Sequence, residues 1–316
     1  MLKVFISKWK NYRHRLLPWL ALNLRHRIVP QSEQINCNSK GYIVHLEIEN
    51  CLKEMLLAFE KPYANIDETL IIFGGNSSKR RHLFESYGRK NREILLHKFG
   101  FDLDIKQSAM QEAGKGVFVR RGRIMRGQVV ALYPGTIYLP YQPILLPSIG
   151  NPYIFRCADG IFIDGNYKGL SALFYRSIHG RDRISSRIPV CDISWLHLRS
   201  VMQYSHSRNS IHSSDVNLNM VINPLNVGQI INNANPKITG HSANLAYHEI
   251  TVTFGENESD TFKDFSILGL MPNAYYKGDT LNLSGNPLLK VVALVATRDV
   301  HEGEELLSTY FTLVDK

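Results

Sequence analysis

The sequence predicts an α+β fold that is mainly β and is preceded by a helical N-terminal region. Two stretches before residue 100 show helical periodicity, whereas residues after about 114 alternate between short β-rich runs and turns. Hydrophobic residues make up 44% of the 316 residues and charged residues 21%, as is usual for a folded protein. We therefore predict a basic, largely helical region at 1–100 and a second domain at 101–316.

The helical region should contain two helices. The first is expected at residues 43–60, where apolar residues recur at the spacing of one buried face, namely Ile48, Leu52, Met55, Leu56 and Phe59. The second is expected from about 78 to 99, with two basic clusters at Lys79–Arg81 and Arg89–Arg92. These clusters could form a nuclear-import or nucleic-acid patch, but a solvated helix face explains them more simply.

Short strands separated by Gly and Pro are expected in the remainder of the chain. The β-rich runs are Val117–Val119, Val129–Tyr133, Ile161–Ile163, Thr251–Phe254 and Val291–Ala296. A polar insertion is predicted within this domain at about 176–215. It contains His206, His212 and Asp215, whose spacing matches no known ligand pattern, so we expect no metal there.

The net charge of +9 is concentrated near the N-terminus. Residues 1–100 hold 17 Lys and Arg against 9 Asp and Glu, whereas the other residues hold 20 against 19. The basic third could therefore contact nucleic acid, an anionic membrane or an import receptor. The nearly neutral remainder does not indicate a nucleic-acid-binding surface.

The first 32 residues contain no Asp or Glu. Their apolar run, Leu16–Leu24, is too short to span a bilayer, and no clear secretory cleavage site follows it. A mitochondrial presequence and a basic helix that packs on the domain or a partner both fit this segment. Dispersed cysteines without a CxxC pair predict free thiols in a reducing compartment, and they are Cys37, Cys51, Cys157 and Cys191. We expect an intracellular protein without a transmembrane segment, in the nucleus or the mitochondrion.

Four separated parts of the second domain carry the candidate site. In chain order they are Gly114–Phe118 with Gly127–Gly135, Ile161–Asn166, Gly228–Ala234 with Ala243–Tyr247, and Val292–Phe311. A Gly-Lys-Gly or an Asp-Gly pair alone marks turns in many proteins. The fourth part is the most specific, because it reads A-T-R-D-V-H-E-G-E-E-L-L-S-T-Y from Ala296 to Tyr310.

Together these parts resemble the SET domain of protein lysine methyltransferases, over about residues 114–313. The first resembles the family's opening Gly-x-Gly strand and hairpin, the second its Ile-Asp-Ala strand, and the fourth its closing A-x-R-D-I-x-x-G-E-E-L-x-x-x-Y. The third is similar to Asn-His-Ser-x-x-Pro-Asn, with Asn232 at the family's Asn. Asn233, Ala234 and Ala243 stand where the family has His, Ser and Pro.

The resemblance implies a fold of several small curved sheets with a knot-like threading of the C-terminal segment. It implies S-adenosyl-L-methionine as the cofactor, a lysine of a protein as the methyl acceptor, and no metal. Tyr310 matches the catalytic tyrosine, and Tyr133 and Tyr247 match tyrosines of the lysine channel. The cofactor would contact Tyr310 and four further residues, namely Lys115, Gly116, Asn232 and Asn233.

Two alternatives to an active enzyme follow from the same sequence. The altered loop at Asn233 and Ala234 also fits a SET-fold binding or scaffold protein that holds the cofactor poorly or lacks activity. The basic N-terminal third fits a nucleic-acid-associated protein, a class that is supported by charge alone.

Overall fold

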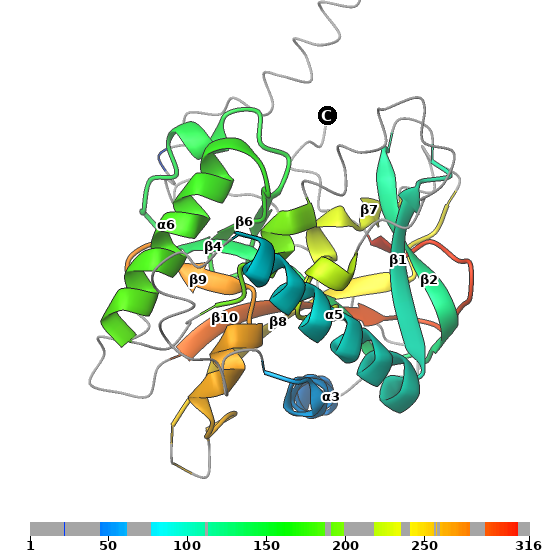
Figure 1. Ribbon diagram of the computed structural model, residues 1–316. Helices are drawn as coiled ribbons and strands as arrows, with labels where there is room; N and C mark the ends of the chain where they lie inside the picture. The colour runs from blue at the N-terminus through cyan, green and yellow to red at the C-terminus, as the bar shows by residue number, and fades with distance from the viewer. Residues whose placement is uncertain are drawn as a thin grey trace, which may run out of the picture.

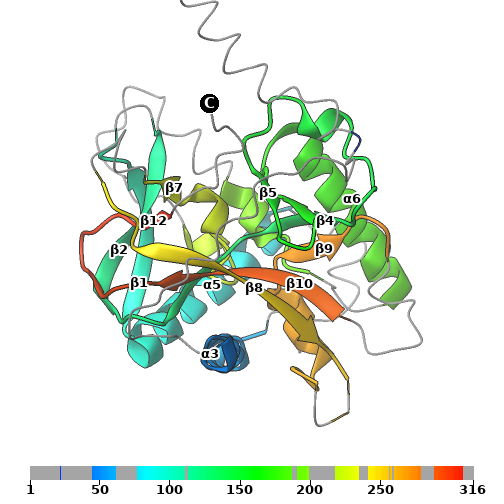
Figure 2. The same ribbon diagram turned by 180° about the vertical axis from the view of Figure 1, so that it is seen from behind.

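The computed structural model describes residues 22, 45–61, 77–110, 113–186, 191–198, 218–234, 241–255, 257, 260–278 and 288–308. Within these residues the strands form three small sheets, against which several helices pack (Figure 1). The predicted α+β class is thereby confirmed. In Figure 1, α5 crosses in front of the central strands, whereas β8 and β10 face the viewer from the opposite side in Figure 2.

Both predicted N-terminal helices are present, as α3 (His45–Ala58) and α5 (Ser77–Phe99). The five apolar residues of the predicted face of the first helix are all buried, and they belong to the same hydrophobic core as the strands. The predicted boundary near residue 100 stays a prediction. No helix in the described ranges has both the length and the apolar composition that a membrane crossing would need.

The basic residues of α5 differ in their exposure to solvent. Arg89 and Lys90 are exposed and pair with acidic residues of α5 and of the segment after α3, as expected for a solvated face. Arg92 departs from that expectation, because its side chain is buried. Its partner is Asp102, which lies on a strand that the sequence did not predict, β1 (Phe101–Gln107).

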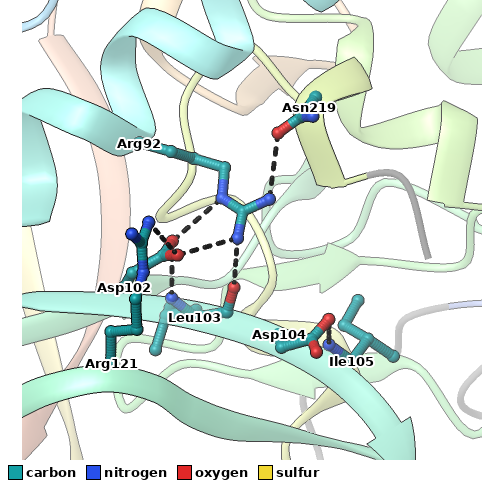
Figure 3. Close-up of polar contacts among 7 residues, drawn as sticks. All are labelled: Arg92, Asp102, Leu103, Asp104, Ile105, Arg121 and Asn219. Carbon is teal, nitrogen blue, oxygen red and sulfur yellow. Dashed lines mark hydrogen bonds and ion pairs between the residues drawn. The ribbon is translucent and has the colours of Figure 1, made fainter. Parts of the chain in front are cut away.

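Figure 3 shows how Arg92 joins α5 to the first sheet. Its Nε and one terminal nitrogen donate to the two carboxylate oxygens of Asp102 at 2.9 and 3.0 Å. The guanidinium also donates to Leu103 O and Asn219 Oδ1, while Arg121 donates to Asp102 from the adjacent strand. This closed set of polar contacts ties α5 to two strands.

The first sheet has the order β1–β2–β11, in which β1 and β11 both run antiparallel to β2. Its other two strands are β2 (Lys115–Ile124) and β11 (Val300–His301). The pairing of β11 with β2 brings the opening and closing parts of the predicted domain together, although they lie far apart in the sequence.

The central sheet has the order β3–β10–β8–β12–β7. Its strands are β3 (Val129–Leu132), β10 (Leu288–Ala296), β8 (Leu245–Thr253), β12 (Leu307–Ser308) and β7 (Asn232–Asn233). The strand β12 pairs in parallel with both β7 and β8. The closing segment therefore lies between two strands that precede it in the sequence. Residues 235–240 and 309–316 lie outside the described ranges, so the knot-like threading stays a prediction.

The third sheet has the order β5–β6–β4–β9 and is contacted by α6. The elements are β5 (Ile154–Arg156), β6 (Phe162–Asp164), β4 (Gly135–Tyr138), β9 (Asn273–Tyr275) and α6 (Gly169–Ser186). The sequence did not predict α6, more than half of which falls in the expected polar insertion. The insertion's candidate ligands, His206, His212 and Asp215, lie outside the described residues.

Short 3-10 helices complete the described chain. They are η1 (Leu146–Ser148), η2 (Ser194–His197), η4 (Leu218–Met220), η5 (Gly228–Ile230) and η6 (Phe265–Leu270). The described cysteines, Cys51, Cys157 and Cys191, are free thiols as predicted. Cys37 and the candidate presequence lie outside the described residues, apart from Leu22.

Candidate active site

The closing segment runs along β2 in the direction opposite to that strand. After β11, Gly303 adopts a left-handed φ of 84°, which favours glycine, and its amide donates to Val119 O at 2.9 Å. Val119 N then donates to Glu304 O, and Leu306 N donates to Val117 O. This pairing places the Glu305 backbone opposite Phe118 and its side chain beside Gly116.

Gly116, Asn232 and Glu305 meet at one point, which we call the Asn232–Glu305 junction. The Asn232 Nδ2 donates to Glu305 Oε1 at 2.9 Å and to Lys115 O at 3.1 Å. A Cβ on Gly116 would overlap Glu305 Oε1 and lie 2.9 Å from Asn232 Nδ2. Gly116 is therefore needed because two side chains from distant parts of the chain approach its backbone.

The other oxygen of Glu305 is held by the segment between β1 and β2. Its Oε2 accepts from Ser108 Oγ at 3.0 Å and from Ala109 N at 3.3 Å. Among the described residues, no Lys, Arg or His forms an ion pair with Glu305. The carboxylate is thus fixed by uncharged donors.

The Asn244 side chain binds the backbone of the closing segment. It is buried, its Nδ2 donates to Glu305 O at 2.8 Å, and its Oδ1 accepts from Leu307 N at 2.8 Å. Ala234 N also donates to Ser308 O. The third and fourth predicted parts of the site are therefore joined by backbone and amide hydrogen bonds.

An aromatic cluster of Tyr133, Phe155 and Tyr247 lies where β3, β5 and β8 converge. The ring centroid of Phe155 is 5.3 Å from that of Tyr133 and 4.9 Å from that of Tyr247. The Tyr133 hydroxyl donates to Tyr153 O at 2.9 Å, and the Tyr247 hydroxyl is 3.0 Å from Ser308 Oγ. The two tyrosines predicted for the channel are thus brought together, with rings 6.5 Å apart.

The second predicted part packs against the edge of this cluster. A Cβ on Gly165 would lie 2.9 Å from Tyr133 Cε1, so glycine is required for this close contact. Burial raises the pKa of Asp164 to about 6, although hydrogen bonds from Ser171, Asn151 and Asn166 oppose that effect. One Asp164 oxygen, Oδ2, has no partner among the described residues.

Lys115 and Asn233 lie beside the junction, whereas Tyr310 lies outside the described residues. Partial burial lowers the pKa of Lys115, and the nearby charge of Asp104 opposes that shift. Asn233 belongs to β7 and pairs with Ser308, which precedes Tyr310 by two residues. The described part of the closing segment thus contacts both the junction and the aromatic cluster.

A charged cluster also involves β8. The Cys157 Sγ and carboxylate oxygens of Asp159 and Glu249 lie within 4.8 Å of one another, a grouping that could hold a metal ion. The Lys290 ammonium pairs with Asp159 at 2.8 Å and with Glu249 at 2.7 Å. Burial lowers the pKa of Lys290, but these two partners outweigh it and raise the value to about 12. A cationic side chain therefore already occupies this cluster and offsets one of its two carboxylate charges.

Comparison with known proteins identifies the family. SET domain-containing protein 9 of Homo sapiens is 34% identical over 332 aligned residues, which cover 99% of this chain and 98% of that protein. The chain belongs to the SET-domain family. SET domain-containing protein 9 of Pongo abelii is 39% identical over 225 residues, which cover 71% of this chain and 69% of that protein. The chain matches no protein-family model.

The family resemblance that the four sequence parts predicted is thus confirmed. Some residues that hold this SET domain's candidate site had no role assigned from the sequence. Glu305 and Asn244 were within the recognised parts, but nothing in their spacing revealed that they contact each other. Ser108 and Phe155 were in none of those parts, and only the tertiary structure brings them to the site.

Proposed function

We propose that the chain is an S-adenosyl-L-methionine-dependent methyltransferase that acts on a lysine of a protein. Family membership supports the reaction class. The observation that carries the proposal is the convergence of Gly116, Asn232 and Glu305 beside a closing segment that also contacts the aromatic cluster. A cofactor position and an aromatic acceptor channel would then lie on two sides of one segment.

The junction fits the cofactor by two features of this chain. Gly116 leaves its main chain open to close approach, and the Asn232 Oδ1 accepts no hydrogen bond within the described ranges. Asn232 would hold the cofactor through its side chain, with Lys115, Gly116 and Asn233 beside it. When bound, S-adenosylmethionine supplies an electrophilic methyl group on a positively charged sulfur.

The acceptor lysine must be neutral to use its lone pair. With a reference pKa of about 10.4, deprotonating it at pH 7.4 costs about 4 kcal/mol. A dry channel reduces that cost because burial disfavours the ammonium form. The buried ring of Tyr133 and the partly buried rings of Phe155 and Tyr247 would exclude water, and the released proton would pass to solvent.

The two channel tyrosines would also orient the amine. The Tyr133 hydroxyl donates its proton to Tyr153 O, so its oxygen can accept from an amine N–H. The Tyr247 hydroxyl is held by Ser308 Oγ. Because both hydroxyls occupy space at the channel wall, we expect them to limit the number of methyl groups on the product.

Replacing Tyr310 with Phe tests the assignment of the catalytic hydroxyl. We expect Tyr310→Phe to retain the fold and cofactor binding and to lower methyl transfer by about 100-fold or more. The measurement is transfer of labelled methyl from S-adenosylmethionine to nuclear and mitochondrial extracts, which also reports the substrate and its compartment. Tyr141→Phe, at an exposed residue that makes none of the site contacts described above, serves as the control. Unchanged turnover in Tyr310→Phe would overturn the assignment.

The scaffold alternative is favoured by one observation, the replacement of the family's His and Ser by Asn233 and Ala234. Calorimetric titration with S-adenosylmethionine separates the two proposals. A saturable heat change supports the enzyme, whereas its absence in a folded protein supports the scaffold.

A further inference from the structure

We propose that Glu305 is a positioning residue that orients the Asn232 amide so that its oxygen receives the ammonium group of the cofactor. This inference rests on the proposed function. It assigns a role to a carboxylate that itself would not touch the reacting atoms, and it predicts which ligands the site should prefer.

The orientation of the Asn232 amide follows from the chemistry of its partners. An asparagine amide can present either its NH2 group or its oxygen to a neighbour, since the two arrangements differ by a flip of the group. The Glu305 carboxylate and the Lys115 carbonyl can only accept hydrogen bonds. Only the NH2 group can face both of them, and both of its N–H bonds are then used.

The amide oxygen is consequently the group left for a ligand. Within the described part of the chain, Asn232 Oδ1 accepts no hydrogen bond, and it is not among the buried atoms that lack a partner. The Asn232 oxygen can therefore accept a hydrogen bond from a ligand that carries a donor. An amine or ammonium group satisfies it, whereas a ligand carboxylate would meet two oxygens of like polarity.

The charge of Glu305 makes a cationic donor preferable to a neutral one. The carboxylate lies one hydrogen bond from Asn232, and no described Lys, Arg or His neutralises it. A positive group held by Asn232 Oδ1 would therefore be stabilised by a nearby negative charge in a partly buried position. The α-ammonium of the methionine part of the cofactor has this chemistry.

Glu305 can act in this way because its own side chain is held on several sides. Ser108 Oγ and Ala109 N bind its second oxygen, and Gly116 leaves room for the first. Its backbone oxygen accepts from Asn244. These contacts prevent the carboxylate from turning away from Asn232.

Two ligands that differ only in the amine test the inference. S-adenosylhomocysteine carries the α-amine, and its des-amino analogue has hydrogen in that position. We expect the wild-type protein to bind S-adenosylhomocysteine about 30-fold more tightly, the range of one charge-assisted hydrogen bond. In Glu305→Ala we expect this ratio to fall to about threefold or less, because the negative charge beside the amide is lost and, of its two acceptors, Lys115 O alone remains to orient it. Glu305→Gln should give an intermediate ratio, since a neutral oxygen can still accept from Asn232.

The ligand ratio distinguishes positioning from a merely structural role. A general loss of structure would weaken both ligands equally and leave the ratio unchanged. Glu304→Gln is the matched control, because the neighbouring Glu304 pairs with Arg298 at the surface and has no contact with Asn232. Its ratio should equal that of the wild-type protein.

A reversed hydrogen bond provides a second test that does not depend on the Ala variant folding. Asn232→Asp places a carboxylate against Glu305 and should weaken S-adenosylhomocysteine by about 10-fold or more. Adding Glu305→Gln supplies an NH2 donor for the new carboxylate, so the double variant should bind more tightly than Asn232→Asp alone.

The outcomes separate this inference from the proposed function. If the wild-type protein binds neither ligand, the proposed function fails. If it prefers S-adenosylhomocysteine, and both Glu305 variants keep that preference while the double variant shows no recovery, Glu305 has no positioning role and the inference is overturned.

Discussion

Two carboxylates, Asp102 and Glu305, each join separate elements of this protein, and they differ in whether the surrounding polar groups all have partners. Asp102 is fully buried between Arg92 and Arg121, and both of its oxygens accept hydrogen bonds from within the protein (Figure 3). Glu305 is only partly buried, and among the described residues it has no cationic partner and binds an amide whose oxygen accepts no hydrogen bond. In the described part of the chain, the Asp102 network has all its partners, whereas the Glu305 carboxylate lacks a cation and the Asn232 oxygen lacks a donor.

This difference separates a contact for stability from a contact for ligand binding. A buried ion pair contributes little net energy when complete but is costly to break, because one charge is left unpaired in the interior. A partly exposed carboxylate with uncharged donors costs less to maintain and still attracts a positive ligand. We therefore expect changes at Asp102 to affect unfolding and changes at the Asn232–Glu305 junction to affect binding.

The largest expected effect is the loss of Asp102. Asp102→Ala leaves the Arg92 guanidinium buried without its carboxylate and should lower the free energy of unfolding by about 3–5 kcal/mol. Urea denaturation followed by circular dichroism measures this. Arg121→Gln is the control, since that side chain is 53% exposed and should change stability by less than about 1 kcal/mol. If both variants lowered the free energy of unfolding by the same amount, the buried contact of Arg92 with Asp102 would not be the one that stabilises the fold.

A smaller effect on stability, with a large effect on binding, is expected at Gly116. The Cβ in Gly116→Ala would displace Glu305 and Asn232, so S-adenosylhomocysteine should bind about 100-fold more weakly. The free energy of unfolding should fall by only about 1–2 kcal/mol, because both side chains can move toward solvent. Gly180→Ala, in α6 with open space around its added Cβ, should leave binding unchanged. Tight binding by Gly116→Ala would show that the junction does not hold the ligand.

Asp164 gives the smallest expected effect and extends the comparison to a buried carboxylate that pairs with no cation among the described residues. Its pKa is raised from 3.8 to about 6 by burial, so the folded state holds the proton more tightly than the unfolded state. The free energy of unfolding should therefore decrease as pH rises from about 4 to about 6 and level off above that range. In Asp164→Asn this decrease should become shallower, with a gain of about 1 kcal/mol at pH 7.

Urea denaturation at pH 4.5 and at pH 7 checks the Asp164 prediction. Burial also raises the pKa of Asp192 to about 6, so part of the slope should persist in Asp164→Asn. A slope identical to that of the wild-type protein would show that Asp164 does not titrate in this range.

Local patterns were sufficient for some elements and insufficient for others. The periodic apolar residues of α3 predicted its buried face because a helix repeats every 3.6 residues whatever it packs against. The strand β1 was not predicted although its apolar residues Phe101, Leu103 and Ile105 alternate with polar ones, as in a half-buried strand. What the alternation does not reveal is that Asp102 and Asp104 are buried as well. Arg92 was taken for a surface residue because its partner lies on that unpredicted strand.

The sequence by itself determined the α+β class, the two N-terminal helices and the family, because these depend on local periodicity and on motifs that are contiguous in the chain. Only the tertiary structure decided that Gly116, Asn232 and Glu305 share one junction. These residues come from three separate segments, and the pairing of β2 with the closing segment and of β12 with β7 brings them together. The spacing of residues along a chain carries no information about such contacts, whereas hydrogen-bond geometry does. The closing segment is therefore recognisable from sequence, but its role beside Asn232 becomes visible only in three dimensions.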